Sequence, residues 1–218
     1  MDVYYDPYDY VEADPYATYS LLREHASVYH NEKLGFWAIS RHADVREALR
    51  DYKRFSNSRG ISIEPSAAGP EAHRLASIVA LDPPDNLRIR HVVARFFSRR
   101  GISSIESDIR NLTRARLDAV LRKDGFDFVG DFVEQLPMEI LCLIMGAPAR
   151  DTDKIRHLSE LLVLRTEQDH DLPRKAIGAI VELQHYYRAL VARRDHDRRD
   201  DLISILLEAS DRDIITPE

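Results

Sequence analysis

Apolar side chains recur at helical spacing along much of this chain, most clearly between Leu81 and Phe97. Asp82 is expected to accept hydrogen bonds from the first free N–H groups of a helix, and Pro83 and Pro84 fall where a missing N–H costs nothing. Successive helical residues are rotated by about 100°. One face is therefore apolar, with Ile89, Val92, Val93 and Phe96. The stretch is predicted to be an amphipathic helix.

The opposite face of this helix is basic, and it carries Arg88, His91, Arg95 and Arg99. Such a face is by default a solvated helix surface. A docking patch for an acidic protein is the specific alternative, because clustered charge of one sign steers association.

Arg90 departs from this division, since it falls one turn after Asn86 on the flank of the apolar face. A guanidinium held against an apolar layer needs an anion, because an unpaired buried charge is costly. That anion is either a nearby Asp or Glu side chain or a ligand.

The remaining pattern predicts a mainly α protein with a small β-sheet portion. Residues 27–29 and 36–39 read as short strands paired across Gly35, and residues 125–129 as a third strand. Residues 1–13 are rich in Tyr and Asp without periodicity, so we expect a loosely packed arm there.

The helices in the rest of the chain are predicted from their start and stop signals. An early helix opens at Asp14-Pro15, and Ser40 is expected to cap the next one. Asp131 is expected to cap an apolar helix that ends at Gly146 and kinks at Pro137. Residues 81–218 are mainly helical in this interpretation, with amphipathic helices near 152–166 and 173–191 and a last helix near 202–208.

Residues 55–80 break the helical pattern, with polar and glycine-rich stretches between isolated apolar residues. A loop of this length in a compact domain is usually functional or disordered. Its spaced apolar side chains favour a binding loop over a spacer. The side chains expected to contact a ligand are Ile61, Ile63, Leu75, Ile78 and Val79.

Composition narrows the functional classes. The chain has 218 residues, 44% of them hydrophobic, and a net charge of −6, which argues against nucleic-acid and anionic-membrane partners. No basic leader and no membrane-length apolar run occurs, so we expect a cytoplasmic protein. Phosphate-loop, dinucleotide and nucleophile-elbow motifs are absent from the sequence.

Candidate metal ligands are weak. The single cysteine, Cys142, lies in an apolar run and is predicted to be an inert core thiol. His170 and His196 each stand between two aspartates, which suggests metal ligands, but solvated turns are the favoured interpretation because consecutive side chains point apart. No metal site is predicted.

The order of elements resembles the cytochrome P-450 family of haem-thiolate monooxygenases, in its soluble bacterial form. The stretches that carry the resemblance are Asp14-Pro15-Tyr16, Trp37-Ala38-Ile39-Ser40-Arg41, Val45-Arg46-Glu47-Ala48-Leu49, Phe55-Ser56, Leu81-Asp82-Pro83-Pro84, Arg88-Ile89-Arg90, Leu136-Pro137 and Met145-Gly146-Ala147-Pro148. The resemblance covers essentially the whole chain, and the Asp-Pro-Pro helix start with its arginines is its most specific part.

The resemblance implies a heme cofactor, with Arg90 binding a haem propionate. The family also expects a propionate-binding histidine where this chain has Asn86, which carries no charge. The substrate, an apolar small molecule, would meet the apolar residues of the 55–80 loop. The face with Arg88, His91, Arg95 and Arg99 would meet the electron donor, an acidic iron–sulfur protein served by its own reductase.

The resemblance further implies that the axial cysteine and the long central helix belong to a second half that this sequence lacks. Thr216-Pro217-Glu218 reads as a helix start at which the sequence stops. Residues 1–218 are therefore expected to form a single incomplete domain, the N-terminal half of the fold truncated before its central helix, and to be inactive alone. The alternative is a non-catalytic helical binding or partner-regulating protein built on the same framework.

Overall fold

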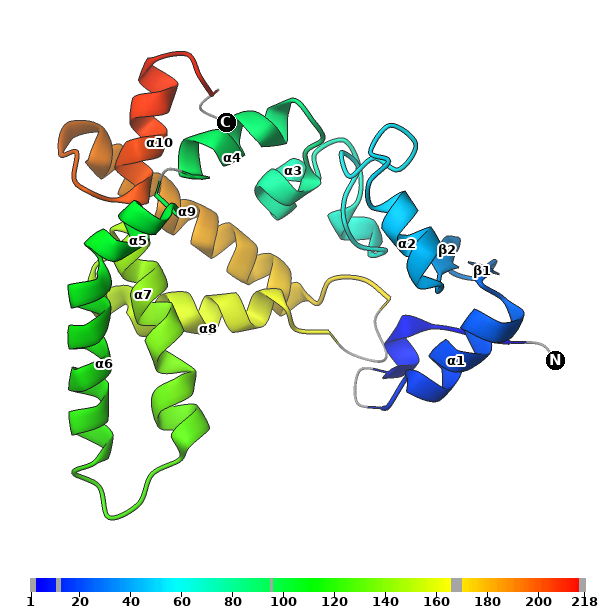
Figure 1. The fold of residues 1–218 in the computed structure, drawn as a ribbon, viewed down its shortest axis with the longest axis horizontal. Coiled ribbons are helices and arrows are strands. Elements are labelled where there is room, and N and C mark those ends of the chain that lie inside the picture. Colours follow the sequence, from blue (N-terminus) through cyan, green and yellow to red (C-terminus); the bar gives the residue numbers. More distant parts are fainter. Residues whose placement is uncertain (1–2, 11–12, 95, 166–169, 216–218) are drawn as a thin grey trace. The chain divides into compact units, whose positions relative to one another are not determined.

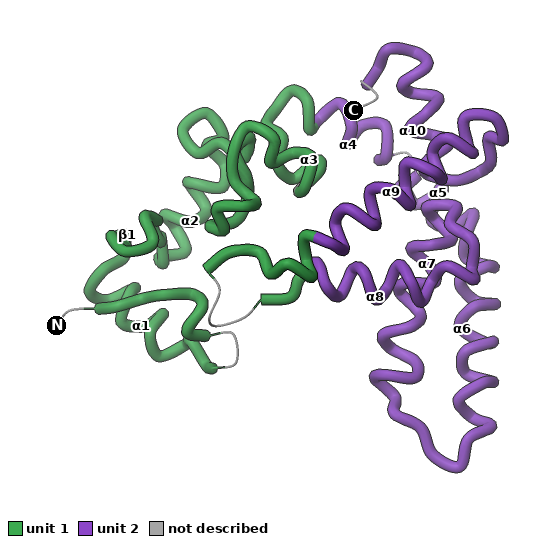
Figure 2. Tube along the Cα trace, turned by 180° about the vertical axis from the view of Figure 1, so that it is seen from behind, with its two compact units in different colours: residues 1–86, 163–177 green, residues 87–162, 178–218 purple. Residues whose placement is uncertain are grey.

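The computed structural model describes residues 3–10, 13–94, 96–165 and 170–215. Its chain divides into two compact units (Figures 1 and 2), and each is described by itself. Unit 1 comprises residues 1–86 and 163–177, and unit 2 comprises residues 87–162 and 178–218.

Unit 1 contains the β-sheet expected from the sequence. Strands β1 (Val28–Asn31) and β2 (Phe36–Ile39) pair antiparallel, with Val28 opposite Ile39 and Asn31 opposite Phe36. Gly35 closes the turn with φ of 68°, a conformation that favours glycine, and its N–H donates to the Asn31 carbonyl. The other elements are η1 (Pro7–Tyr10), α1 (Tyr16–His25), α2 (His42–Ala48), η2 (Pro65–Ala67), α3 (His73–Ala76) and η3 (Ser77–Ala80).

The expectation of a loosely packed arm is wrong for the described residues 3–10. The Tyr5 ring contacts the rings of Tyr10, Tyr19, Tyr29 and Phe36, with centroids 5.9–6.4 Å apart. The Tyr5 carbonyl also accepts a hydrogen bond from the Asn31 side chain at 2.9 Å. Aromatic side chains bury large areas without any periodic pattern, so the arm packs although its sequence looks irregular.

Unit 2 is helical. Its elements are α4 (Asp85–Ala94, which begins in unit 1), α5 (Arg99–Ser104), α6 (Glu106–Val120), the π-helix η4 (Val129–Val133), α7 (Gln135–Met145), η5 (Ala149–Asp151), α8 (Thr152–Leu162), α9 (Arg174–His196, which also begins in unit 1) and α10 (Leu202–Asp211). Side chains from α7, α8, α9 and α10 form its larger core, which includes Cys142, Ile155, Leu183 and Ile203. These helices form because apolar residues recur on one face of each and bury against the others.

The third strand predicted at residues 125–129 does not form. Residues 125–127 are irregular, Phe128 is helical, and the π-helix follows. A strand needs a hydrogen-bonded neighbour, and among the described residues only β1 and β2 pair. The expected cap Asp131 lies inside the π-helix, where its carboxylate accepts from the Asp127 N–H at 3.0 Å. Pro137 falls in the first turn of α7, so the predicted kink has no interior bond to break.

The predicted end of α7 at Gly146 is confirmed, and it is a tightly packed junction. Gly146 is left-handed, with φ of 72°, and its carbonyl accepts from Arg194 Nη2 at 2.7 Å. Arg194 Nε also donates to Asp201 Oδ2 at 2.5 Å, and both side chains are buried. Asp201 in turn caps α10 by accepting the Ser204 N–H at 2.9 Å. One ion pair therefore joins the ends of α7 and α9 to the start of α10.

Asp82 and Ser40 do not cap the helices that the sequence assigns to them. Helix α4 starts at Asp85 rather than directly after Asp82, whose carboxylate accepts from Ser56 Oγ and, at 2.9 Å, from the Asn57 N–H. Ser40 does not cap α2, since its hydroxyl donates to the Ser27 carbonyl at 3.3 Å. Short polar side chains at loop ends can bond to a neighbouring loop as readily as to their own helix.

Charged helix ends also differ from the sequence pattern. Helix α9 runs on to His196, beyond the helix expected near 173–191, so His196 is helical and does not lie in the expected turn. The helix start expected at Thr216 lies outside the described residues. No described helix is long and apolar enough to cross a membrane.

Candidate functional site

Arg90 and Asn86 lie one turn apart on α4, as the sequence predicts. Arg90 is exposed, whereas the pattern had placed it against an apolar layer. Within the described part of the chain it makes no hydrogen bond or ion pair, so the alternative of an Asp or Glu partner finds no support there. An exposed, unengaged guanidinium is suited to receive an anionic group.

Asn86 is half-buried and its side chain is already engaged. Its Nδ2 donates to the Leu81 carbonyl at 3.0 Å, while its Oδ1 is buried without a partner. A carboxylate accepts hydrogen bonds and cannot satisfy an acceptor such as Oδ1. Only the second N–H of the amide remains for an anion, so the arrangement fits a propionate at Arg90 better than at Asn86.

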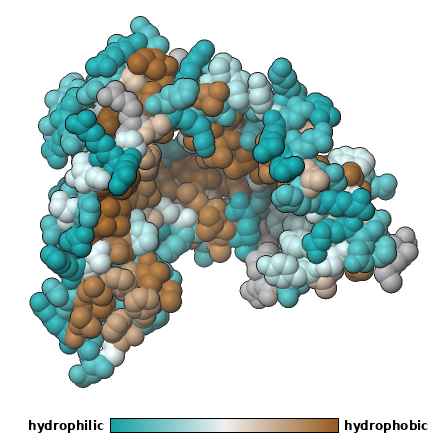
Figure 3. Space-filling view, viewed as in Figure 1, coloured by the Kyte–Doolittle hydropathy of each residue, from teal (hydrophilic) through white to brown (hydrophobic). Residues whose placement is uncertain are grey.

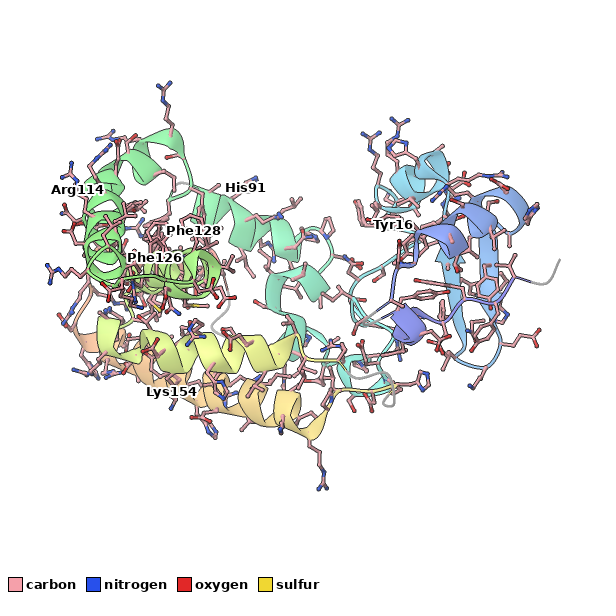
Figure 4. The ribbon with its side chains drawn as sticks, turned by 90° about the horizontal axis from the view of Figure 1, so that it is seen from below. Tyr16, His91, Arg114, Phe126, Phe128 and Lys154 are labelled. Atoms are coloured by element: carbon pink, nitrogen blue, oxygen red, sulfur yellow. The ribbon has the colours of Figure 1, made fainter. Side chains whose placement is uncertain are left out.

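The predicted helix with two faces forms only in part, because α4 ends at Ala94 with no residue fully buried, and Phe96 and Arg99 lie beyond it. Val93 packs against a small core made by Phe96, Ile144 and Leu202, and Phe96 is buried. Arg88, His91 and Arg99 are exposed, and Figure 4 labels His91 on its helix. Arg95 lies outside the described residues. Three of the four predicted members of the basic face are thus available at the surface.

The apolar residues of the 55–80 loop are mostly exposed, as a binding role requires. Ile61 and Ile63 lie in bends, at 54% and 42% exposure. Leu75 lies on α3, and Ile78 and Val79 on η3, two short helices that contact each other. The loop is therefore more ordered than its sequence suggests. The structure brings Leu75, Ile78 and Val79 onto adjacent elements.

Burial and side-chain contacts show the environment of each candidate metal ligand. Cys142 is 2% exposed in the core of unit 2, and burial raises the pKa of its thiol, which confirms the prediction of a core residue. His196 is exposed at the end of α9. His170 is not a solvated turn, because its Nε2 lies 3.1 Å from Asp6 Oδ2. Among the described residues no cluster of His, Cys, Asp and Glu is suited to hold a metal ion.

The sequence reasoning missed a polar cluster in unit 1 that includes this histidine. Glu64 is 5% exposed and pairs with Arg165, with 2.5 Å between Oε1 and Nε. Burial alone would raise the pKa of Glu64, but hydrogen bonding by Ser62 and its own amide, together with Arg165, holds that pKa below its usual range. No local sequence signal could have found this pair, since its members are 101 residues apart.

Tyr8 completes the cluster from the N-terminal arm. Its ring meets the His170 ring edge-on, with centroids 4.8 Å apart. Burial, followed by the charge of Glu64, raises the pKa of Tyr8 to about 12. The phenol therefore stays protonated at neutral pH and remains a hydrogen-bond donor.

Comparison with known proteins identifies the fold to which these elements belong. No protein-family model matches the chain. It is 40% identical over 205 residues to a protein of Mycobacterium tuberculosis named cytochrome P450 123, covering 94% of this chain and 51% of that protein. It is 33% identical over 192 residues to the erythromycin C-12 hydroxylase of Saccharopolyspora erythraea, covering 86% of this chain and 46% of the hydroxylase.

Solved structures of other proteins share this fold. The crystal structure of CYP109E1 from Bacillus megaterium in complex with testosterone superposes with a TM-score of 0.79 at 23% identity, over 91% of this chain and 51% of that one. The chain belongs to the cytochrome P450 family.

This P450 chain spans about half the length of the curated relatives that it matches. Its mainly helical architecture with one small sheet corresponds to the N-terminal half of the P450 fold, as the resemblance implied. Members of the family are haem-dependent monooxygenases of small molecules.

Proposed function

We propose that this chain supplies the N-terminal half of a haem-dependent monooxygenase, with Arg90 as the anchor for a haem propionate. The observation that carries the proposal is the exposed Arg90 guanidinium on α4, which has no carboxylate partner among the described residues. A charge-assisted hydrogen bond to a carboxylate is stronger than a neutral one. Arg90 would bind and orient the cofactor, and Asn86 would contribute one N–H at most.

Haem, when bound, supplies the oxygen chemistry, and the protein supplies binding and orientation. In this proposal Ile61, Ile63, Leu75, Ile78 and Val79 line part of the pocket for an apolar small molecule and exclude water from it. The buried Cys142 does not serve as an axial ligand in this proposal, because burial raises the pKa of its thiol and it packs in the core at 2% exposure. The isolated chain is accordingly proposed to be inactive.

The exposed side chains of Arg88, His91 and Arg99, together with Arg95, are proposed to meet an acidic electron-donor protein. Attraction between opposite charges at exposed sites is screened by salt. Donor binding should therefore weaken as ionic strength rises.

Titration of the purified chain with ferric haem tests the Arg90 assignment. Arg90→Ala should weaken binding about ten-fold, because a hydrogen bond to a charged group is worth roughly 1.5–3 kcal/mol and 1.4 kcal/mol is ten-fold. Arg114→Ala is the matched control, since Arg114 is an exposed arginine on α6 (Figure 4). Equal effects of the two substitutions, or no haem binding by the unchanged chain, would contradict the assignment and favour the non-catalytic alternative.

A further inference from the structure

Three segments that are far apart in the sequence meet in unit 1 through charged and polar side chains. They are the N-terminal arm, the 55–80 loop and the described residues that precede and follow positions 166–169. Their contacting side chains, called the latch below, are Asp6, Tyr8, Glu64, Ser66, Arg165, His170 and Asp171.

The latch has three links, and each is well formed. Arg165 pairs with Glu64 at 2.5 Å. Asp171 accepts from Ser66 twice, at 2.9 Å from its N–H and at 2.6 Å from its hydroxyl. His170 contacts Asp6 at 3.1 Å. Two links thus hold the loop, and the third holds the arm.

Burial makes these links matter for conformation. Asp6, Tyr8 and Glu64 are at most 5% exposed, so each would leave a desolvated polar group behind if its partner moved away. Two buried atoms, Tyr8 Oη and Glu64 Oε2, have no hydrogen-bond partner in the described structure. The charge of Glu64 is nevertheless felt at Tyr8, where it raises the pKa of the phenol. Glu64 and Tyr8 therefore share one buried environment, whereas the Ser66–Asp171 link is exposed.

Outside the latch, the loop is tied by the bonds of Ser56 and Asn57 to Asp82 and by the Gly69 N–H, which donates to the Arg59 carbonyl. Of its apolar residues, Ile61, Ile63, Leu75 and Val79 are all at least 40% exposed. Segments with few buried apolar contacts open locally at low free-energy cost. Polar ties at Glu64 and Ser66 therefore add to the backbone bonds that restrain residues 60–68.

We propose that the latch is a conformational control on the 55–80 loop, in which the N-terminal arm and the loop are released together when any one link is broken. Its effect on substrate entry rests on the proposed function, which gives this loop a substrate-binding role. The latch itself is a property of unit 1 and can be measured without haem or substrate.

Hydrogen exchange of the purified 218-residue chain tests the proposal. Arg165→Ala should accelerate exchange about ten-fold in residues 60–68 and also in residues 3–10, which the His170–Asp6 link joins to the latch. Arg59→Ala is the matched control, because Arg59 is an exposed arginine of the same loop whose side chain makes no hydrogen bond or ion pair with the described residues, and it should leave both regions unchanged. Acceleration confined to the neighbourhood of residue 165 would overturn the latch.

Two milder variants test the same proposal in case Arg165→Ala prevents folding. Ser66→Ala removes one hydroxyl link and His170→Ala removes the arm link. If the latch acts as a unit, either single substitution should accelerate exchange in both regions. The acceleration in the double variant should then be smaller than the product of the two single accelerations. Fully multiplicative effects would overturn the proposal. Because no readout uses haem, failure here leaves the Arg90 assignment standing, and failure of haem binding leaves the latch standing.

Discussion

At the residue scale, single residues hold the ends of α7 and α9 against the start of α10 in unit 2. Gly146 has a positive φ, and a Cβ at this position would overlap the Asp201 carboxylate. That carboxylate is the buried partner of Arg194 and the cap of α10. The glycine is therefore required twice, by backbone conformation and by space.

Gly146→Ala should lower the free energy of unfolding by about 3 kcal/mol or more, because displacing one member of a buried ion pair alone costs roughly that much. Urea unfolding of the two chains measures the difference. Gly125→Ala is the control, since no atom lies within 4 Å of a Cβ there, and it should change stability by less than about 0.5 kcal/mol. Similar losses for both glycines would contradict this role of Gly146.

Cys142 gives a second test at this scale. Burial raises the pKa of its thiol, so little nucleophilic thiolate is present near neutral pH. A thiol-specific reagent at pH 8 should label the folded chain at least ten-fold more slowly than the chain in denaturant. Labelling at equal rates would mean that the core around Cys142 is open in solution.

At the element scale, the sequence predicted those elements whose signal is local. The β1–β2 pair and the end of α7 were identified correctly, and α4 was placed correctly but runs only from Asp85 to Ala94. The caps at Asp82, Ser40 and Asp131 were assigned wrongly because their side chains bond to residues outside the helix concerned. The packed arm was missed because its aromatic contacts carry no period.

The structure of the segment between α6 and α7 was also predicted wrongly from its local sequence pattern. Its alternation of aromatic and acidic residues predicted a strand, but no second strand pairs with it in the described structure. The result is a π-helix beside an apolar surface (Figure 3), made by Leu121, Phe126, Phe128, Val129 and Val133. Figure 4 labels Phe126 and Phe128. An exposed apolar patch of this kind is a site for association.

Replacing Phe126 and Phe128 together by Ser should reduce binding of a hydrophobic dye by about half, since both rings are exposed, at 39% and 57%. Dye fluorescence at fixed protein concentration measures the effect. Leu49→Ser is the control, because Leu49 is 82% exposed but lies on a different unit. An equal decrease with Leu49→Ser would show that the dye does not prefer the patch.

At the scale of the whole molecule, the candidate site was predicted only in part. Arg88, Arg90 and His91 lie on α4, where its periodicity placed them, whereas Arg99 of the expected basic face lies on α5 and Arg95 lies outside the described residues. The pair of Glu64 with Arg165 and that of Ser66 with Asp171 depend on tertiary folding, and their members are separated by 101 and 105 residues. No single-sequence pattern reports such distant partners, so the latch required the structure.

Buried carboxylates in both units should make the chain sensitive to acid. Burial opposes ionisation of Glu64 and Asp201, but hydrogen bonds and their arginine partners outweigh it and lower both pKa values. A carboxyl with a lowered pKa stabilises the fold above its unfolded pKa, near 4, and this stabilisation is lost as pH falls through the folded pKa.

Unfolding free energy should therefore be nearly constant from about pH 7 to pH 5 and should fall below about pH 4. Urea titrations across this range measure it. Asp201→Asn should be less stable at neutral pH and show a shallower fall in acid. Stability that rises as pH drops below 4 would contradict the assigned ion pairs.

The central claim is that Arg90 anchors a haem propionate, and the most direct measurement compares ferric haem with its dimethyl ester, in which both propionates are neutral. The unchanged chain should bind haem about ten-fold more tightly than the ester, and Arg90→Ala should bind the two equally. The same preference for haem in Arg90→Ala as in the unchanged chain would contradict the claim.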